Sequence, residues 1–557
     1  MYILSVNATR NGEWLQPDFT VHGFRYAEIS GLSVLSTSDV VAVRIGANIT
    51  QSSRLQLSNE RIQKVQTATV NTQLANTQDI FTDCPQRSER LGWLGDAAVS
   101  AEEANLNFGN GGISHYYKHF LQMIGDAQDK TSGAVPNMVP TPWQLNSQMP
   151  SAVSWGSAYP TIVHEVWMTT GDRSVITQHL DGLVRYMATM ENTPASKMRH
   201  GFGDWFPPCP LDTDHSAAGA KKCPSADPSL CAASSFIMNC RQVSAVAAAV
   251  GNTSVHAHYS AVAQRLTAEF NAAWLRGNST YSRTPHALQT EVSLPLWLGI
   301  VPAEAKAAVV DTLVADIKAN DYHVTTGLLG TRSVYEALAM NGRVDVALKM
   351  LNQTTMPSFG YIVENSLEPS STLWEKWDAP LRTTDQVDSS RAHIMFGSIS
   401  AFFWKYLVGL RPAAAGWQRA VVAPSAERCS AAAETGDDDQ QDGPPLLESV
   451  NATLSTVSGD IHVSWQLQDG EAGDSSLSFT LNVTLPVETS VVVPCVQATS
   501  VLLWDGRVVW RGGASAEAAE GRPAGREAPG GGVAFAVPAG HHCFRRTGSS
   551  PLIRVEE

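Results

Sequence analysis

The spacing of apolar residues along the chain predicts a helical middle part between two regions of strands. Between residues 57 and 411, apolar residues recur at steps of three and four, the pattern of helices with one buried face. The segment 252–277 is a clear case, with Thr253 or Ser254 as capping candidate before its first apolar residue and Gly277 at its end. Its apolar face comprises Val255, Tyr259, Val262, Leu266, Phe270 and Ala273. A second case is 301–320, where Pro302 suits the first helical turn.

The number of such segments bears on the architecture. We expect roughly a dozen helices in residues 57–411, separated by loops rich in Pro, Gly and Trp. That number suits a closed helical toroid and excludes a simple four-helix bundle.

The region before the helices has the alternating pattern of strands. Phe19 and Val21, and then Phe24 and Tyr26, alternate with other residues in a stretch that glycines interrupt. Residues 1–56 are too few to form a core of their own, so we expect them to be the remnant of an N-terminal β-domain.

Near Gly409 the pattern changes again, to short alternating or apolar segments such as 460–468 and 476–487. These segments predict a C-terminal β-sandwich over residues 412–557. Two stretches of low complexity, 429–445 and 512–532, are expected to be surface loops of this domain. The sequence as a whole therefore predicts a mainly α protein with β-structure at both ends.

Composition and charge narrow the class of protein. Of the 557 residues, 43% are hydrophobic and 17% are charged, an ordinary balance for a folded protein. The formal net charge of −14 argues against nucleic acid or an anionic membrane as the main partner. No apolar run approaches the length of a membrane-spanning helix. An enzyme or binding protein with a neutral ligand fits these features best.

Cysteines and glycosylation sequons favour a secreted or lumenal protein whose start is missing, although the first residues lack the pattern of a signal peptide. Four cysteines fall in one loop-like stretch: Cys209, Cys223, Cys231 and Cys240. We expect two disulfides rather than zinc ligands, because no CxxC pair is present and only His215 is nearby. The sequons are at Asn7, Asn48, Asn252, Asn278, Asn352, Asn451 and Asn482.

Two distant clusters of acidic residues are the candidates for chemistry. The first, at 82–96, holds Asp83, Glu89 and Asp96 together with two arginines and a tryptophan. A charged loop with local ion pairs is the alternative interpretation of that cluster. The second cluster carries Glu364, Glu368, Glu375 and Asp378 beside Trp374 and Trp377.

Paired acidic clusters with tryptophan are what sugar hydrolysis requires. One carboxyl group protonates the leaving oxygen and another acts on the opposite face of the sugar, while flat rings stack on it. Asp204 and Trp205, in the stretch HGFGDWFPP, are a third and weaker candidate.

The motifs resemble those of the α-L-rhamnosidase family of inverting glycoside hydrolases over nearly the whole chain. DCPQRSERLGWLGDA is similar to the family's most distinctive stretch, DCPQR(D/E)ERLGWTGDA. GDW, HVTTGLLGT, MPSFGY, STLWEKWD and HIMFGS follow in the order of the family. The resemblance implies an (α/α)₆-barrel catalytic domain at 57–411, followed by a β-sandwich and preceded by β-domains.

By matching position, the resemblance implies that Glu89 is the general acid and Glu375 the general base, with Glu364 as a rival for the base. It also implies that Asp83, Arg87, Trp93, Asp96, Trp205 and His393 line a rhamnose pocket, to which we add Asp204 and Trp377 as candidate contacts. We expect a rhamnose-containing glycoside or polysaccharide as substrate, with no cofactor and no metal. Departures from the family pattern occur at Ser88, Leu94, Ser157 and Ala392.

Two other classes of function fit parts of the sequence. A sugar-binding protein without catalysis would also need acidic and tryptophan clusters, but it would not need the opposed pair Glu89 and Glu375. Another helical-toroid enzyme, a phosphorylase or a lyase, would need a phosphate site or a Tyr or His base. An inverting hydrolase should hold its two carboxyl groups roughly 6.5–9.5 Å apart.

Overall fold

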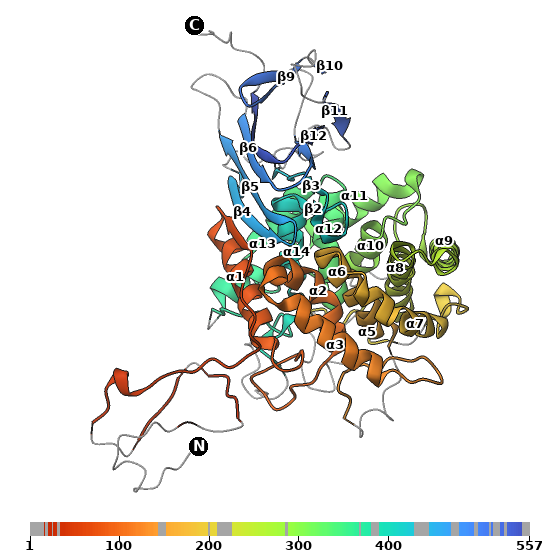
Figure 1. Cartoon of the computed structure of the whole chain (residues 1–557), viewed down its shortest axis with the longest axis vertical. Helices are drawn as coiled ribbons and strands as arrows, with labels where there is room; N and C mark the ends of the chain where they lie inside the picture. The colour runs from red at the N-terminus through yellow and green to blue at the C-terminus, as the bar shows by residue number, and fades with distance from the viewer. Residues whose placement is uncertain are drawn as a thin grey trace.

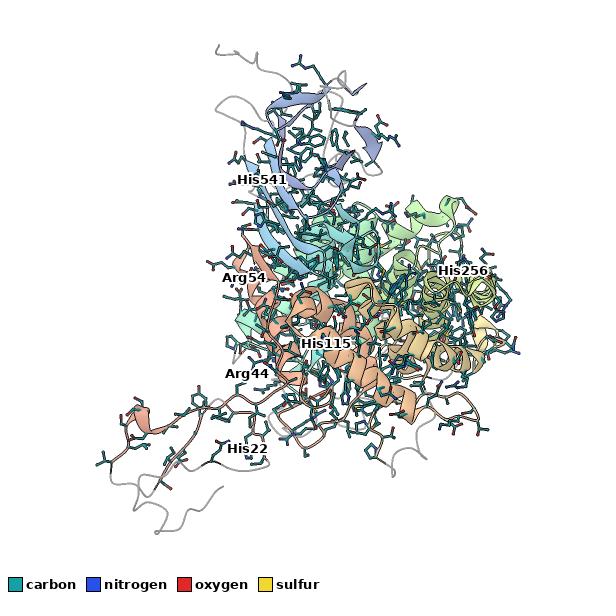
Figure 2. All side chains as sticks on the ribbon, viewed as in Figure 1. His22, Arg44, Arg54, His115, His256 and His541 are labelled. Carbon is teal, nitrogen blue, oxygen red and sulfur yellow. The ribbon has the colours of Figure 1, made fainter. Side chains whose placement is uncertain are left out.

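The computed structural model describes residues 16, 20–24, 26–30, 34–142, 152–198, 201–208, 225–283, 288–366, 369–379, 389–427, 445–468, 478–494, 500–511, 514–515, 524–528 and 532–547. Helices form the body of the molecule, and the C-terminal strands lie at one end of it (Figure 1). The N-terminal segment, which carries His22 and Arg44, extends away from the body, whereas His115 and His256 are exposed residues on helices of the body (Figure 2).

Helices of two kinds alternate along the chain. One kind is buried over most of its surface and comprises α2 (Leu94–Phe108), α6 (Ala158–Thr170), α8 (Pro228–Ala249), α10 (Leu288–Trp297) and α12 (Leu328–Met340). The other kind keeps a polar face and comprises α3 (Ile113–Ala127), α7 (Ser174–Ala188), α9 (Thr253–Trp274), α11 (Ala303–Ala319) and α13 (Val344–Asn352). Helices that are buried on nearly all sides lie inside the barrel, and helices that keep a polar face lie outside. The two kinds therefore form an inner and an outer layer.

The sixth hairpin closes the ring by joining the two ends of the helical region. α1 (Glu60–Asn76) contacts α14 (Ile399–Phe402) and the short helix η9 (Ile394–Phe396) that precedes α14. The remaining short elements are α5 (Val153–Gly156), η2 (Thr37–Asp39), η3 (Gly109–Gly111), η4 (Ala195–Lys197), η7 (Tyr361–Asn365), η10 (Phe403–Leu407) and η11 (Ala415–Trp417). The expected (α/α)₆ barrel is confirmed.

Two helices show how well the periodicity identified the outer layer. α9 begins at Thr253, and its N-cap is Asn252, whose side chain accepts a hydrogen bond from the backbone N–H of Val255; the cap therefore lies one residue before the predicted candidates Thr253 and Ser254. α11 starts directly after Pro302. Both segments were predicted as helices, and both predictions are confirmed.

The prediction for the cysteine-rich stretch was wrong where the structure describes it. Cys231 and Cys240 lie within the inner helix α8, are buried and have free thiols. They therefore form neither a disulfide nor a loop, since α8 packs them into the core of the barrel. Cys209 and Cys223 lie outside the described residues.

The C-terminal part forms two sheets, as expected from its alternating pattern. The larger sheet has the order β1-β4-β5-β6-β13-β8-β9-β10 and the smaller one β11-β12-β7-β3-β2. Their bounds are Arg54–Leu57 (β1), Leu410–Pro412 (β2), Ala420–Val422 (β3), Ser449–Thr456 (β4), Gly459–Gln468 (β5), Ser478–Leu485 (β6), Thr489–Val493 (β7), Val501–Trp504 (β8), Arg507–Arg511 (β9), Ala514–Ser515 (β10), Arg526–Ala528 (β11), Gly532–Val537 (β12) and Gly540–Thr547 (β13).

Rings from both sheets share one core. Phe535 of β12 packs against Trp504 of β8 and Phe544 of β13. The larger sheet is also tied to the barrel, because the indole N–H of Trp465 donates to the carbonyl of Leu407. Most of the two low-complexity stretches at 429–445 and 512–532 lies outside the described residues.

The N-terminal segment differs from its prediction. The described residues between 20 and 50 contain the short turn η2 and no strand, so the strands expected there are not found. The first strand among the described residues is β1, and it pairs with β4 of the C-terminal sheet. None of the described helices combines the length and the apolar character needed to cross a membrane.

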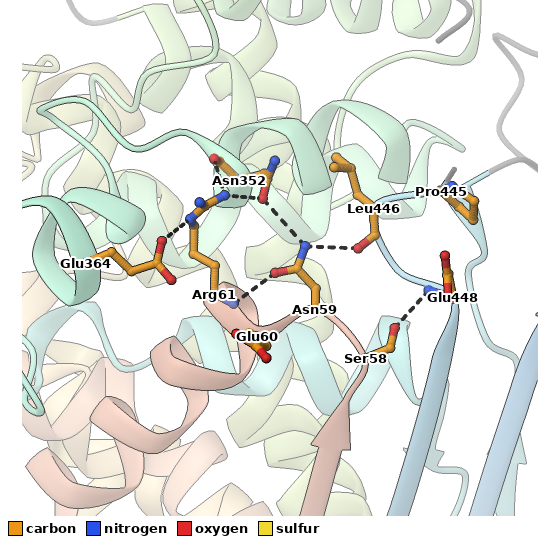
Figure 3. A pocket seen from close by; sticks show the side chains of 9 residues that line it. All are labelled: Ser58, Asn59, Glu60, Arg61, Asn352, Glu364, Pro445, Leu446 and Glu448. Carbon is orange, nitrogen blue, oxygen red and sulfur yellow. Dashed lines mark hydrogen bonds and ion pairs between the residues drawn. The ribbon is translucent and has the colours of Figure 1, made fainter. Parts of the chain in front are cut away.

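A polar hollow marks the junction between the barrel and the C-terminal sheet (Figure 3). Arg61, on the first turn of α1, donates to Glu364 and to Asn352 there. The side chain of Asn59 reaches across the hollow to the carbonyl of Leu446. These bonds join the start of α1, the end of α13 and the chain just before β4.

Candidate active site

The first acidic cluster is a closed loop that leads into the inner helix α2. The backbone N–H of Asp83 donates to the carbonyl of Leu91, and the N–H of Leu91 donates to Asp83 Oδ1. The loop then passes Gly92, where a Cβ atom would lie 1.9 Å from the carbonyl oxygen of Val139. Only glycine allows this close approach, which holds Trp93 at the start of α2. The cluster is therefore a hydrogen-bonded loop at the N-terminal end of an inner helix, and it is not a solvated turn.

One arginine joins the two acidic clusters. Arg87 Nη2 lies 2.5 Å from Glu89 Oε2, and Arg87 Nη1 lies 3.2 Å from Glu375 Oε2. Because one guanidinium group contacts both carboxylates, their nearest oxygens lie within about 8 Å of each other. A separation beyond about 12 Å, which would separate the pair from any shared reaction, is excluded.

The two carboxylates differ in surroundings. The side chain of Glu89 is 32% exposed, and Trp93 Nε1 donates to its Oε1 at 2.9 Å. The side chain of Glu375 is 8% exposed, and the backbone N–H of Ser390 donates to its Oε2 at 2.7 Å. One carboxyl group is thus open to a ligand and the other is held inside the site.

Glu364, the rival for the second role, lies elsewhere. It binds Arg61 and Lys64 of α1 and lines the junction hollow of Figure 3. No ion pair between Glu364 and Arg87 is present among the described residues. The geometry therefore favours Glu375 as the partner of Glu89.

The buried residue His393 lies near the carboxylates of this site. His393 Nε2 is 3.0 Å from Asp96 Oδ1, and both side chains are buried. Burial alone would lower the pKa of His393. The carboxylates of Asp96, Glu375 and Asp83 outweigh it and raise that pKa to about 9. Burial raises the pKa of the Asp83 carboxyl to about 7, although His393 opposes this change.

Cys84 connects the neighbouring groups and was not predicted as a site residue. Its thiol lies 2.9 Å from Asp83 Oδ2, and Arg87 Nε donates to its sulfur at 3.2 Å. Burial raises the pKa of this thiol well above the ordinary value, so the sulfur is a neutral donor and acceptor. Its position within the DCPQR motif was the available signal.

Aromatic rings line the exposed side of the site. Trp93 packs against Phe202, which contacts Trp205, and Trp205 contacts Phe206. The ammonium of Lys376, next to Glu375 in the chain, lies 4.4 Å from the centre of the Phe206 ring. The Trp205 side chain is 38% exposed and offers a ring to a ligand. Phe202 and Phe206 were not predicted, although they flank the GDW motif.

Two predicted sugar contacts have other surroundings. Asp204 is buried, and its carboxylate accepts hydrogen bonds from Thr290 and from the backbone N–H groups of Gly327, Leu329 and Gly330. This is a cap on the first turn of α12, which differs from the predicted contact with sugar.

Trp377 is 1% exposed, stacks on Phe396 and donates to the carbonyl of Thr326. Its ring faces are covered by protein, so it supports the site from behind. Neither burial nor capping was visible in the sequence.

Comparison with known proteins identifies the family. The model of the bacterial alpha-L-rhamnosidase 6 hairpin glycosidase domain matches residues 50–407, which is more than half of the chain. The chain belongs to this family. The model of the bacterial alpha-L-rhamnosidase C-terminal domain matches residues 409–501.

Individual family members are similar over most of this chain. An alpha-L-rhamnosidase of Formosa agariphila is 26% identical over 471 residues, covering 82% of this chain and 46% of that protein. One of Streptomyces avermitilis is 26% identical over 489 residues, covering 86% and 42%. The chain therefore spans about half the length of the curated relatives it matches.

Solved structures agree with the fold. The alpha-L-rhamnosidase of Dictyoglumus thermophilum superposes with a TM-score of 0.73 at 28% identity, covering 90% of this chain and 51% of that one. The Streptomyces avermitilis enzyme, solved in complex with L-rhamnose, gives a TM-score of 0.72 at 23% identity, covering 90% and 42%. At that lower identity the likeness shows the fold alone.

Proposed function

We propose that this chain hydrolyses terminal α-L-rhamnosyl residues of glycosides with inversion of configuration. The observation that carries the proposal is the bridge of Arg87 between Glu89 and Glu375, which joins two clusters far apart in the sequence. Membership of the rhamnosidase family supports the substrate class, and so do the curated relatives named alpha-L-rhamnosidase.

In the proposed mechanism Glu89 is the general acid. It is the more exposed carboxyl group, so it can reach the glycosidic oxygen of a bound substrate. Among the described residues, Arg87 and the indole N–H of Trp93 donate to its oxygens, and the acid role requires Glu89 to carry a proton in the complex with substrate. That proton is left for the leaving oxygen.

Glu375 is the general base of the same step. The backbone N–H of Ser390 fixes one of its oxygens, and Arg87 holds the carboxylate on the side that faces Glu89. A water between Glu375 and the sugar would lose a proton to the carboxylate and attack the anomeric carbon from the face opposite the leaving group. The upper limit of about 8 Å between the nearest oxygens of the two carboxylates is compatible with the spacing of inverting enzymes, roughly 6.5–9.5 Å, and also with the roughly 5–5.5 Å of retaining enzymes, so the anomer of the product decides between them.

The other site residues are proposed to hold the sugar. In the proposed pocket, Asp83, Asp96 and His393 would supply the buried polar groups, and Trp93 and Trp205 the aromatic rings. Carboxylates can accept bonds from sugar hydroxyls while a ring covers an apolar face of the sugar. We further propose that residues 57–411 are the catalytic domain and 412–557 the C-terminal β-domain.

The test is an assay of the purified chain with a chromogenic α-L-rhamnoside, together with ¹H NMR of the first product. We expect hydrolysis, and β-L-rhamnose as the anomer that forms first. Release of the α-anomer first would refute inversion. Binding of L-rhamnose without any hydrolysis would instead indicate a sugar-binding protein.

A further inference from the structure

Three buried side chains beside the proposed catalytic pair have the composition of a metal site. Asp83, Cys84 and His393 each offer a ligand atom, and these atoms lie within 4.8 Å of one another. All three residues are buried, and no other such group occurs in the part of the chain that the structure describes. A carboxylate oxygen, a thiol sulfur and an imidazole nitrogen are the ligands that Zn²⁺ accepts in proteins.

The histidine provides an independent observation. Its Nε2 lies 3.0 Å from Asp96 Oδ1, whereas its Nδ1 is buried and has no hydrogen-bond partner among the described residues. Metal-binding histidines usually place one nitrogen on the metal and the other beside a carboxylate. His393 has a carboxylate beside Nε2 and a buried Nδ1 without a hydrogen-bond partner among the described residues, which fits this arrangement.

The other two ligands are also held by neighbours. Asp83 Oδ1 accepts the N–H of Leu91, which leaves Oδ2 directed at the Cys84 sulfur. Arg87 Nε donates to that sulfur, and such a donor stabilises a thiolate once the thiol proton is lost. Orientation of the ligands by surrounding hydrogen bonds is what distinguishes a built site from a chance cluster.

We propose that Asp83, Cys84 and His393 bind a thiophilic divalent cation, with Zn²⁺ as the reference ion, and that the bound ion excludes the sugar. Cation binding follows from the geometry alone, whereas its inhibitory effect rests on the proposed function. Three protein ligands leave a fourth tetrahedral position for water. Because Asp83 and His393 are the proposed sugar contacts, the ion and the sugar compete for the same atoms.

Coordination requires the thiol of Cys84 and the imidazole of His393 to give up any proton on the ligating atom, so cation binding releases protons to solvent. Hard cations such as Mg²⁺ and Ca²⁺ prefer oxygen ligands and should not bind to this set.

The test uses Co²⁺ as a spectroscopic substitute for Zn²⁺ on the whole chain. A cobalt–thiolate bond gives a sulfur-to-metal charge-transfer band, which we expect for the unaltered chain and which excess Zn²⁺ should remove. Cys84→Ser should abolish the band. Cys543→Ser removes a half-buried free thiol on β13, outside the site, and should leave the band unchanged.

A second variant and a competition measurement complete the test. His393→Gln keeps the thiol but removes the nitrogen, so it should weaken Co²⁺ binding by about tenfold or more even if Cys84→Ser fails to fold. L-rhamnose should weaken Co²⁺ binding, and Zn²⁺ should inhibit hydrolysis competitively. Absence of the band, or its persistence in Cys84→Ser, would overturn the proposal. A band in a chain that cleaves no rhamnoside would leave the metal site standing and refute the proposed function.

Discussion

Replacing Glu89 by glutamine separates the proposed acid role from any effect on folding. Glutamine keeps the size of the side chain, and its amide oxygen can still accept the hydrogen bond of Trp93 Nε1. It loses the ion pair with Arg87 Nη2. Because the Glu89 side chain is 32% exposed, that pair resembles a surface ion pair, which is worth about 0–1 kcal/mol. The free energy of unfolding should therefore change by less than about 1 kcal/mol.

The expected loss of catalysis is much larger than that. General acid assistance is worth about 10²–10⁴-fold in rate, which corresponds to about 2.7–5.4 kcal/mol at about 1.36 kcal/mol per tenfold. A folding defect of less than about 1 kcal/mol cannot produce such a fall in turnover while the protein remains mostly folded. Binding of rhamnose should largely survive in Glu89→Gln.

The assay compares two α-L-rhamnosides that differ in how readily the aglycone leaves. A very good leaving group needs little protonation, so it should partly restore turnover in Glu89→Gln. It should not restore turnover in Glu375→Gln, because the attacking water still needs a base. Since both groups act in one displacement, the double variant should lose less than the product of the two single losses.

Two results would refute the reasoning. Near-normal turnover in both single variants would show that neither carboxylate takes part in the chemical step. Rescue of Glu375→Gln rather than Glu89→Gln by the good leaving group would show that the acid and the base had been assigned in the wrong order.

Three further expectations concern the surroundings of the pair. Asp204→Asn should lower the free energy of unfolding in urea by about 1–3 kcal/mol, because it weakens a buried cap of α12; an unchanged value would contradict the capping role. Trp205→Ala should raise KM by roughly 2–10-fold and leave the unfolding midpoint unchanged, since an exposed ring contributes to binding more than to the core. The pKa of His393 is raised from its ordinary 6.5 to about 9 in the folded state. Its contribution to stability is therefore complete below pH 6.5 and lost as the pH rises to 9. His393→Gln should flatten the dependence of unfolding free energy on pH in that window, and an unaltered slope would contradict the assignment.

The outer helices could be predicted from the sequence because each has one buried face and one solvent-exposed face. α9 and α11 show a repeat of three and four, a cap or a proline at the start, and an end signal. The inner helix α8 has no such repeat, since it is buried on nearly all sides and contains many small residues. The sequence therefore predicts a loop-like stretch around its cysteines, Cys231 and Cys240, where the structure has a helix. Hydrophobic periodicity arises when one face of a helix is buried and the opposite face is exposed. An inner helix of this barrel is buried on nearly all sides, so its sequence shows little periodicity.

The N-terminal segment shows the opposite error. Phe24 and Tyr26 alternate as strand residues do, yet they are exposed and belong to no strand in the described chain. An alternating pattern indicates a strand only when a neighbouring strand and a core are there to receive it. β1 illustrates this condition, because it is short but pairs with β4.

The motifs predict the proposed catalytic pair, but they do not predict the surroundings of every proposed sugar contact. Glu89 and Glu375 were paired from their contexts, and the bridge by Arg87 is consistent with that pairing. The surroundings of Asp204 and Trp377 could not be predicted, because a carboxylate that caps a helix and one that binds a sugar look alike in a sequence. Burial distinguishes them, and burial depends on the packing of elements far apart in the chain.

The charge of the site bears on the class of glycoside it can accept. Four carboxylates and two cationic groups lie together in the site: Asp83, Glu89, Asp96 and Glu375, with Arg87 and His393. Even with one of the carboxyl groups protonated as the acid, the site carries no surplus of positive charge. An acidic sugar would add a negative charge without a cation to receive it, whereas a neutral sugar can donate its hydroxyl hydrogens to the carboxylates. The net charge of −14 on the whole chain also repels an acidic sugar, at longer range than the groups of the site. The charge pattern therefore favours neutral sugars such as rhamnose over uronic acids, independently of the family resemblance.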